Sequence, residues 1–474
     1  MPEPHIAILG AGPAGAGAAY QLRRTGKARV TVLERNATVG GNAGSFEAAG
    51  QRLDFGSHRL HPACDPAILR DIRALLGPDL LDRPRHGRIR LRGRWIHFPL
   101  KPIDLLLRLD PGFGLGVMRD ATSKLFRRSR EVADAFDAIL QENLGKTICE
   151  DFYFPYARKI WGVEPSALSG IQAHRRVSAG SFQKLIKKVL TQVPGFRPAG
   201  SGRFFYPRRG FGQITEAYAE AAVQRGARLE LEASVTALVP PAEKNGRWTI
   251  RFRKKDEPHT IEADQVWSTI PIPLLAKLQE GAVPQDVLAA AQNIRYRAMI
   301  LVYLHLDVDR FTEFDAHYFP DETTTITRLS EPKNYAAESE PRGRTTLCAE
   351  LPCAFDNAHW QMDEAALGQL VVNDLHTVGL PLTRPPVAVS IKRLPQAYPI
   401  YLHGYERHFR VLDDWANNIP GLLTYGRQGL FAHDNTHHAL AMAYGAADCL
   451  GPHGFDAGRW ADYRAVFETH VVED

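Results

Sequence analysis

The sequence is poor in cysteine and has no long apolar run. The five cysteines of the 474-residue chain are Cys64, Cys149, Cys348, Cys353 and Cys449. Their odd number and irregular spacing argue against a disulfide framework and against a cysteine-ligated metal. The longest apolar run, Ala298–Leu304, is too short to span a bilayer. Because the chain enters an apolar strand almost at once, we predict no signal peptide and a reducing, cytoplasmic location.

A strong excess of one charge is also missing. The chain carries 58 Lys and Arg against 53 Asp and Glu, a net charge of +5. This mild excess is too diffuse to predict nucleic-acid binding, but it fits a small anionic substrate. Internal repeats and low-complexity tracts are absent as well. With 44% hydrophobic residues, the composition is typical of a globular enzyme of two or three domains. It leaves the oligomeric state open.

What the sequence does contain is a nucleotide-binding pattern at its start. An apolar strand, His5–Leu9, leads into three glycines, Gly10, Gly12 and Gly15. Gly10 permits the tight turn, Gly12 lets the backbone approach a pyrophosphate, and Gly15 lets the following helix pack on the strand. The diphosphate is expected at the positive end of that helix, beside Pro13 and Ala14.

A second apolar strand ends in Glu34, which is placed to accept hydrogen bonds from a ribose diol. Its carboxylate favours a free 2′-hydroxyl over the phosphate of NADP. A Gly-Gly doublet, Gly40-Gly41, follows directly, as in the flavoprotein version of this fingerprint. We therefore predict FAD as the cofactor and no metal, with Arg35, Gly41 and Asn42 also in contact with FAD.

The fold class that this pattern predicts is α/β. A Rossmann-like FAD-binding domain is split across both chain ends, with an inserted mixed-sheet substrate domain and a helical subdomain. The predicted boundaries are 1–60, 200–270 and 415–474 for the FAD-binding domain, 61–200 for the hairpin and helical lid, and 271–414 for the mixed sheet.

Local patterns divide these regions further. Period-two alternation over 87–98 predicts a hairpin, and 3.6-residue spacing over 102–150 and 179–193 predicts helices. A helix is expected over 215–225, a strand over 226–232, paired strands over 248–253 and 260–270, and a last helix over 439–449. The basic stretch 124–130 is a solvated helix end or, alternatively, a patch for peripheral membrane contact.

In the order of its motifs the chain resembles one flavoenzyme superfamily, which includes amine oxidases, protoporphyrinogen oxidases and UDP-galactopyranose mutases. The glycine fingerprint, the strand around Val235 and the late Gly426-Arg427 turn are features common to all three. The middle segments resemble the mutase more closely. They are the turn Asp54–His61, the hairpin Gly93–Pro99, the stretch Tyr156–Gly162, the segment Arg295–Arg297 and the loop Gly426–Gly429.

The resemblance implies roles for individual residues. Val235, Gly426, Arg427, Asn435 and Thr436 are expected to contact FAD. Two arginines, Arg175 (with Arg176 beside it) and Arg297, are expected to hold the substrate diphosphate, since guanidinium binds phosphate in a bidentate fork. The alternative is that Arg175 is a loop charge and that Arg297 faces solvent from a strand edge.

Histidines provide the remaining candidates for catalysis. We expect His58 or His61 near the flavin, as a hydrogen-bond donor or proton shuttle, unless they only cap a strand end. His433 stands where the mutase has a tyrosine near the substrate phosphates. A metal site built from His433, His437 and His438 fits no familiar ligand spacing. His437 and His438 are instead expected to open the last helix, with its N-terminus towards the flavin.

Two aromatic residues are candidate substrate contacts. Trp161 either stacks on a base or belongs to the core, and Tyr206, although within reach of substrate, is better explained as core.

Three functions compete on this evidence. The first is isomerisation of a nucleotide sugar between pyranose and furanose forms, through an adduct at flavin N5. The second is oxidation or desaturation of an apolar or amine substrate, as in protoporphyrinogen and amine oxidases. The third is a flavin-binding assembly protein without turnover, which the many polar residues near the expected ring disfavour. The fold is compatible with all three.

Overall fold

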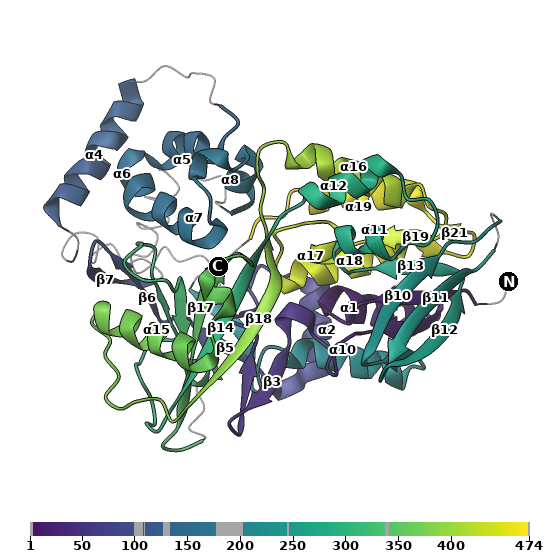
Figure 1. Cartoon of the computed structure of the whole chain (residues 1–474), viewed down its shortest axis with the longest axis horizontal. Helices are drawn as coiled ribbons and strands as arrows, with labels where there is room; N and C mark the ends of the chain where they lie inside the picture. Colours follow the sequence, from purple (N-terminus) through teal and green to yellow (C-terminus); the bar gives the residue numbers. More distant parts are fainter. Residues whose placement is uncertain are drawn as a thin grey trace.

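The structure is a computed structural model that describes residues 3–98, 108, 110–126, 133–176, 202–243, 246–336 and 341–472. Five parallel strands form one sheet, in the order β19 (Leu422–Thr424), β13 (Gln265–Ser268), β1 (His5–Leu9), β2 (Arg29–Leu33) and β9 (Arg228–Glu230). Strands from the beginning, middle and end of the chain therefore lie side by side (Figure 1). This confirms the α/β fold with N- and C-terminal strands in one parallel sheet.

Helices cover this sheet. Helix α1 (Pro13–Arg24) packs against α10 (Gln213–Gln224) and α18 (Thr436–Cys449). The tight approach depends on small residues, since half of α1 is Ala and Gly and its residues 14–22 are buried. Other helices of this half are α2 (Pro66–Leu76), α11 (Ile272–Leu278), α12 (Gln285–Asn293), α16 (Tyr405–Asn417), α17 (Gly426–Gly429) and α19 (Ala457–Phe467).

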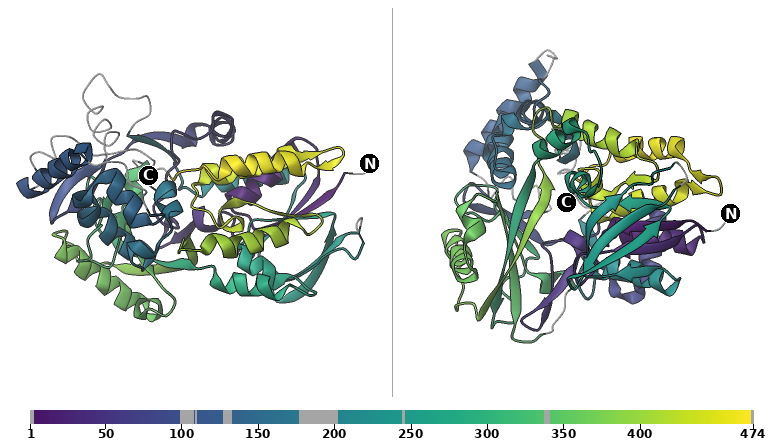
Figure 2. Two further views of the ribbon diagram at one scale, coloured as in Figure 1. Left: turned by 90° about the horizontal axis from the view of Figure 1, so that it is seen from above. Right: turned by 45° about the vertical axis from the view of Figure 1, so that its right-hand side comes forward.

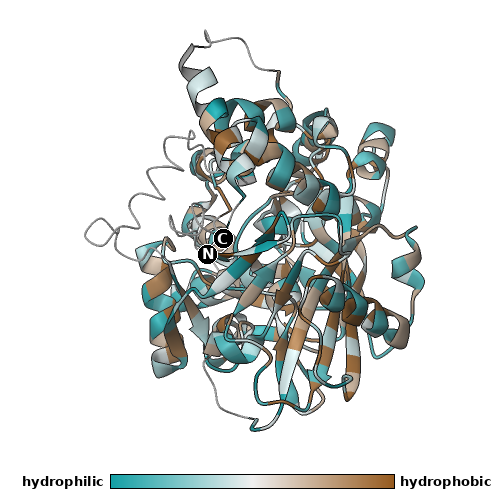
Figure 3. Ribbon diagram, turned by 90° about the vertical axis from the view of Figure 1, so that its left-hand side faces the viewer, coloured by the Kyte–Doolittle hydropathy of each residue, from teal (hydrophilic) through white to brown (hydrophobic). Residues whose placement is uncertain are grey.

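A second, seven-stranded sheet lies beside the first (Figure 2). Its order is β18 (Ala388–Pro399), β14 (Tyr296–Leu306), β17 (Thr345–Cys353), β16 (Arg328–Ser330), β15 (Ala316–Tyr318), β6 (Gly87–Leu91) and β7 (Arg94–Phe98). Its pairs are antiparallel except for β15 with β6. The predicted 87–98 hairpin is thus confirmed, at the edge of this sheet. The long apolar run is part of β14, which is buried over nearly its whole length between β17 and β18, and hydrophobic residues recur along the strands (Figure 3).

Further strands, 3-10 turns and three helices complete the two halves. These are η1 (Gly41–Ala43), β3 (Ser45–Ala48), β4 (Gln51–Asp54), η2 (Gly77–Asp79), β5 (Leu80–Pro84), β8 (Arg203–Pro207), β10 (Ala233–Val239), β11 (Trp248–Lys254), β12 (Glu257–Ala263), α13 (Pro332–Ala336), α14 (Ala358–Gln361), α15 (Glu364–Thr377), β20 (Leu450–Gly451) and β21 (Gly454–Phe455). Helix α15 packs on β14 and β18.

A helical cluster stands next to the β6–β7 hairpin (Figure 1). It contains α4 (Pro111–Phe126), α5 (Phe136–Leu144), α6 (Lys146–Ile148), η3 (Cys149–Tyr153), α7 (Phe154–Trp161), η4 (Pro165–Ala167) and α8 (Gly170–Arg176). Its core includes Phe136, Leu140, Ile160 and Trp161. The helix predicted over 179–193 lies outside the described residues, as does most of the basic stretch after α4. No helix in the described part of the chain is both long and apolar enough to cross a membrane.

Two local predictions are wrong. The run 260–270 is not one strand paired with 248–253: β12 ends at Ala263 and pairs with β11, whereas β13 begins at Gln265 and joins the parallel sheet. Asp264 separates the two strands, and its backbone N–H donates to the His5 carbonyl (2.8 Å). The late helix begins at Thr436 rather than Ala439, so His437 and His438 lie in its first turn as expected, but α19 follows it and it is not the last helix.

Candidate functional site

The predicted phosphate-binding turn has a geometry that leaves its backbone open. Gly10 has a φ of +95°, and a Cβ there would lie 2.7 Å from Thr269 Oγ1. Gly12 is the N-cap of α1 and provides no side-chain cap, with Pro13 following it. A Cβ on Gly12 would meet only Gly40 O, at 4.0 Å. An uncapped helix N-terminus that other atoms leave open fits the diphosphate of FAD.

Glu34 lies at the end of β2, as predicted, and is buried. Its Oε2 accepts a hydrogen bond from the Ala11 backbone N–H (2.8 Å), and its Oε1 accepts from the Asn36 backbone N–H (2.9 Å). Its own carbonyl accepts from Ala233 N–H (2.8 Å), which brings β10 and half-buried Val235 next to the acid. Oε1 accepts a second hydrogen bond from Asn36 Nδ2 (2.8 Å), whereas Oε2 accepts the one from Ala11 and has a lone pair left to accept a hydrogen bond from a ribose hydroxyl. Arg35, by contrast, is exposed.

The Gly-Gly turn connects the two sheets. Gly40 has a φ of +114° and its N–H donates to Ala11 O (2.9 Å), and Gly41 begins η1. Asn42 Nδ2 then donates to the carbonyl of Gln396 on β18 (3.1 Å). The FAD fingerprint on one sheet thus touches the end of a long strand on the other.

The late Gly-Arg turn, α17, also contacts the C-terminal end of β18. Gly426 has a φ of +79° and lies so close to α1 that a Cβ would be 2.8 Å from Ala14 Cβ. Arg427 Nη2 donates to Ala397 O on β18 (2.7 Å), and its guanidinium lies 5.3 Å from the Tyr398 ring centroid. The structure therefore brings together residues from three distant segments, as the resemblance implies. Asn435 and Thr436 follow at the N-cap and first position of α18.

An aromatic cluster, formed by His433, Tyr398, Tyr401 and Trp161, lies next to Arg427. His433 is buried, with its ring 6.4 Å from Tyr398, 4.9 Å from Tyr401 and 6.4 Å from Trp161. Trp161 is 4% exposed and packs on Phe136 in the helical core. The core interpretation of Trp161 is therefore the one that its packing supports.

The two histidines of the 54–61 turn have different surroundings. Half-buried His58 shares Nε2 with the carbonyls of Asn42 and Phe55 (2.9 Å each), and burial lowers its pKa. A neutral ring that donates from Nε2 satisfies both contacts. His61 Nδ1 accepts from Ala63 N–H (3.1 Å), so it caps its own turn. His58 therefore lies directly against the FAD fingerprint, whereas the charge of His61 acts on His437 in the first turn of α18.

The set of His433, His437 and His438, which we rejected as a metal site on its spacing, does not bring its ring nitrogens together among the described residues. Among the described residues, the one group with ligand atoms within 4.8 Å is Asp434, His438 and His470. The rings of His438 and His470 are stacked with their centroids 4.1 Å apart, and His438 Nδ1 already accepts from Asn435 N–H (3.2 Å).

His437 makes the protein sensitive to acid. Burial, followed by the charges of His438 and His61, lowers the pKa of His437 to about 3, below the value near 6.5 expected in the unfolded chain. The unfolded state then binds the proton first, so stability is complete above pH 6.5 and falls as the pH decreases towards 3. At pH 5.5 the expected loss from this residue is on the order of 1 kcal/mol.

Urea unfolding of wild type and His437→Gln at pH 7.5 and 5.5 measures this effect. The variant should lose less stability on acidification than wild type, and a His453→Gln control, at an exposed position, should behave like wild type. Equal losses in all three proteins would contradict the assignment.

The structure places the two predicted diphosphate arginines on a helix and on a strand. Arg175 is in the last turn of α8, not in a loop, and its Nη1 donates to Phe467 O (3.2 Å). Arg297, at the start of β14, is half-buried rather than solvent-facing. It donates from Nε to Ile160 O (3.0 Å) and from Nη2 to Lys159 O (3.3 Å), at the C-terminal end of α7. The side chain of Arg176 lies outside the described residues.

Tyr206 is core, and its prediction as a substrate contact does not fit its surroundings. It is 2% exposed, and its hydroxyl donates to Asp54 Oδ2 (2.6 Å). Asp54 also accepts from Ser45 Oγ (2.6 Å) and Phe211 N–H (2.8 Å). These bonds fix the strand end from which the His58 turn starts.

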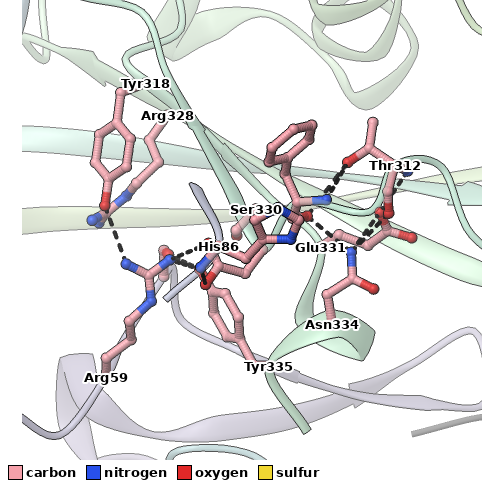
Figure 4. Close-up of polar contacts among 12 residues, drawn as sticks. Arg59, His86, Thr312, Tyr318, Arg328, Ser330, Glu331, Asn334 and Tyr335 are labelled. Carbon is pink, nitrogen blue, oxygen red and sulfur yellow. Dashed lines mark hydrogen bonds and ion pairs between the residues drawn. The ribbon is translucent and has the colours of Figure 1, made fainter. Parts of the chain in front are cut away.

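Sequence reasoning missed two buried arginines next to this turn. Arg59 bonds Asp315 Oδ1 and the hydroxyls of Tyr318 and Tyr335, each at 3.2 Å (Figure 4). Arg328 forms a bidentate pair with Glu350, from Nε to Oε1 (2.9 Å) and from Nη2 to Oε2 (2.8 Å). Arg59 has a sequence signal, because it lies between His58 and His61. Arg328 has none, since its partner is on a neighbouring strand.

The four arginines differ in their charge balance. Asp315 and Glu350 neutralise Arg59 and Arg328, respectively. The side chains of Arg175 and Arg297 donate to backbone carbonyls, and neither forms an ion pair within the part of the chain that the structure describes. These two arginines therefore retain a positive charge for an anionic ligand.

Comparison with known proteins agrees with this architecture. A family model described as flavin-containing amine oxidoreductase matches residues 14–447. A reduced UDP-galactopyranose mutase superposes with a TM-score of 0.81 at 20% identity, covering 99% of this chain and all of that one. A putative protoporphyrinogen oxidase from Exiguobacterium sp. gives 0.71 at 21% identity, covering 94% and 98%. At these identities the structural likeness shows the fold.

Sequence relatives match over shorter stretches. A phytoene dehydrogenase of Streptomyces griseus is 40% identical over 82 residues, which are 17% of this chain and 15% of the relative. A mitochondrial protoporphyrinogen oxidase of Nicotiana tabacum is 26% identical over 171 residues, 35% of this chain and 34% of the relative. The matches therefore span well under half of either relative.

Proposed function

The chain belongs to the flavin-containing amine oxidoreductase family, which implies an enzyme with FAD as its cofactor, and from this premise we propose that its substrate is a nucleotide-activated sugar. The proposed reaction class is mutase-like exchange between pyranose and furanose forms. The observation that carries it is the pair of arginines without an acidic partner, Arg175 and Arg297, beside an aromatic cluster. An uncompensated guanidinium favours a diphosphate over an apolar substrate.

Both arginines border the same cluster. Arg297 contacts the carbonyl of Ile160, the residue before Trp161, whose ring lies 6.4 Å from His433. The positive charge of Arg175 acts on Tyr401 and Tyr405, and Tyr401 in turn packs on His433. A diphosphate between these arginines would place the sugar towards His433 and Tyr398.

The cofactor and the protein have separate tasks in this proposal. FAD, when bound and reduced, supplies a nucleophilic centre for chemistry at the anomeric carbon. Gly12, Glu34, Asn42 and Arg427 would hold it, and His58 would orient its ring region through a neutral N–H. Arg175 and Arg297 would bind the departing diphosphate and keep it in place for its return.

The second candidate is an oxidase or desaturase of an apolar or amine substrate. The segments shared with the phytoene dehydrogenase and the protoporphyrinogen oxidase favour it. The buried ion pairs next to His58 count against it, because an apolar substrate would leave their remaining hydrogen-bonding groups without partners.

The deciding experiment uses anaerobically reduced holoenzyme with a panel of UDP-, GDP- and dTDP-sugars, read by NMR of the anomeric protons. New furanose signals without net flavin oxidation would support the mutase-like function. Unchanged sugars, together with bleaching of oxidised flavin by an amine or a polyene, would replace it with the oxidase.

The arginines can be tested separately. We expect Arg175→Ala and Arg297→Ala to weaken binding of a nucleoside diphosphate by about 10- to 100-fold, the value of a charge-assisted hydrogen bond. Titration calorimetry of the holoenzyme measures this, with Arg247→Ala as control, since Arg247 pairs with Glu262 on the exposed surface. Arg297 also caps α7, so its loss could act by loosening this helix. Arg297→Lys keeps the positive charge but not the guanidinium contacts with α7, and it therefore separates the effect of the charge from that of the cap. Unchanged affinity in both alanine variants would contradict the proposed roles.

A further inference from the structure

The ammonium group of Lys159 joins the helical cluster to the seven-stranded sheet. Lys159 lies in the last turn of α7, and its Nζ reaches the loop between β15 and β16. Four oxygens of that loop surround the ammonium: Phe319 O (2.7 Å), Asp321 O (2.8 Å), Thr324 Oγ1 (3.2 Å) and Ile326 O (2.7 Å). Since an ammonium has three N–H donors, the loop can accept hydrogen bonds from all of them.

The loop that binds Lys159 is itself anchored. Helix α15 holds it through Asp374 Oδ2, which accepts from Thr325 N–H (2.8 Å), Thr325 Oγ1 (2.6 Å) and Ile326 N–H (3.2 Å). At the end of the loop, Thr327 N–H donates to Glu350 O on β17 (2.9 Å). The ammonium therefore ties α7 to a segment that is fixed on both α15 and β17.

The main chain of the same residue contacts a candidate diphosphate arginine. Arg297 Nη2 donates to Lys159 O (3.3 Å), and Arg297 Nε donates to Ile160 O (3.0 Å). The guanidinium also packs on Gly162, the C-cap of α7, where a Cβ would lie 2.6 Å from Arg297 Cζ. A shift of the end of α7 would therefore displace the guanidinium of Arg297.

An uncharged, apolar side chain at position 159 would break this connection. Phe319, Thr324 and Ile326 are buried, so their oxygens would lose a donor that bulk water does not replace. The loop and the end of α7 would then have no polar contact through residue 159, and the seat of Arg297 would be free to move.

We propose that Lys159 is a positioning residue, which clamps the end of α7 to the 319–326 loop and thereby holds Arg297 where it binds the diphosphate. This inference rests on the proposed function, because Lys159 acts on the ligand through Arg297. With its N–H groups used by the loop, Lys159 itself does not touch the ligand.

The first experiment measures the affinity of UDP for the holoenzyme by titration calorimetry at pH 7. The amine is charged at this pH, since burial lowers the pKa of Lys159 only to about 8. We expect Lys159→Met to weaken UDP binding about tenfold or more with flavin content unchanged, because a small misplacement of a binding group is costly. If Lys159→Met does not fold, Lys159→Gln makes the same comparison, since its amide retains two donors.

Lys333→Met is the matched control. Lys333 Nζ also bonds four oxygens, Asp309 O, Asp309 Oδ1, Pro341 O and Arg344 O, at 2.8–3.1 Å, but these lie away from α7. Loss of this ammonium should leave the UDP affinity within about twofold of wild type. UDP affinities within twofold of wild type in the Lys159 variants as well would overturn the inference while the proposed function stands.

A double variant separates positioning from a general structural role. If Lys159 acts through Arg297, adding Lys159→Met to Arg297→Ala weakens UDP binding no further. Losses that add fully would show that Lys159 acts elsewhere, and would overturn the inference.

Hydrogen exchange tests the clamp without any ligand. Peptides that contain α7 should exchange faster in Lys159→Met than in wild type or Lys333→Met. Unchanged exchange in α7 would contradict the clamp. If wild type does not bind UDP, the proposed function fails, and the role of Lys159 in diphosphate binding fails with it.

Discussion

Gly15→Ala is expected to produce protein without bound flavin. A Cβ at this position would lie 1.9 Å from the carbonyl oxygen of Gly10 and 3.1 Å from its carbonyl carbon. Both atoms are backbone in the phosphate-binding turn, so no side chain can rotate away. Helix α1 would have to move off β1, and the amides at its N-terminus would move with it. Displacement of about 1 Å is enough to disrupt a site that depends on aligned N–H groups.

The measurement is the flavin-to-protein absorbance ratio of the purified variant, followed by addition of free FAD. We expect no recovery of the flavin spectrum and a lower melting temperature. Gly114→Ala is the matched control, because Gly114 lies in helix α4 and a Cβ there has no neighbour within 4 Å. Normal flavin content in Gly15→Ala would show that the turn does not hold the diphosphate.

Gly15 and its neighbours could be predicted from sequence because the information is local. The strand, the three glycines and Glu34 lie within 30 consecutive residues, and each has one physical role that few other patterns require. These residues were sufficient to predict the parallel sheet. The split of 260–270 could not be predicted, since its two strands have the same alternation and differ only in the partner sheet.

The contacts of the buried arginines could not be predicted either, because they join residues that are far apart in sequence. Arg59 and Asp315 are 256 positions apart, and Arg328 and Glu350 are joined only by the register of β16 with β17. In sequence Asp315, Arg328 and Glu350 are indistinguishable from exposed charges, and only Arg59 has a signal, its position between His58 and His61. Arg297 illustrates the opposite case: the resemblance identifies the residue, but its contact with the end of α7 comes from the packing of two segments over 130 residues apart.

Asp54→Ala is expected to cause the largest loss of stability among substitutions near the site. It would leave three buried donors without an acceptor: the hydroxyls of Ser45 and Tyr206 (both 2.6 Å) and the N–H of Phe211 (2.8 Å). Each unsatisfied buried donor costs about 1–3 kcal/mol, so for three donors we expect a loss of at least roughly 3 kcal/mol, which is a large part of the stability of a typical domain.

Tyr206→Phe separates the contributions, because it removes one of the three bonds and leaves the other two. Its expected cost is about 1–1.5 kcal/mol, measured by urea unfolding of the holoenzyme, with ligand affinity unchanged. A Tyr206→Phe variant with normal stability but weakened nucleotide-sugar binding would restore Tyr206 as a substrate contact. In Asp54→Ala, the turn that begins at Asp54 also loses its anchor, so His58 should release Asn42 and flavin content should fall together with stability. If stability falls while flavin content is retained, His58 is held by its own bonds rather than by the strand end that Asp54 fixes.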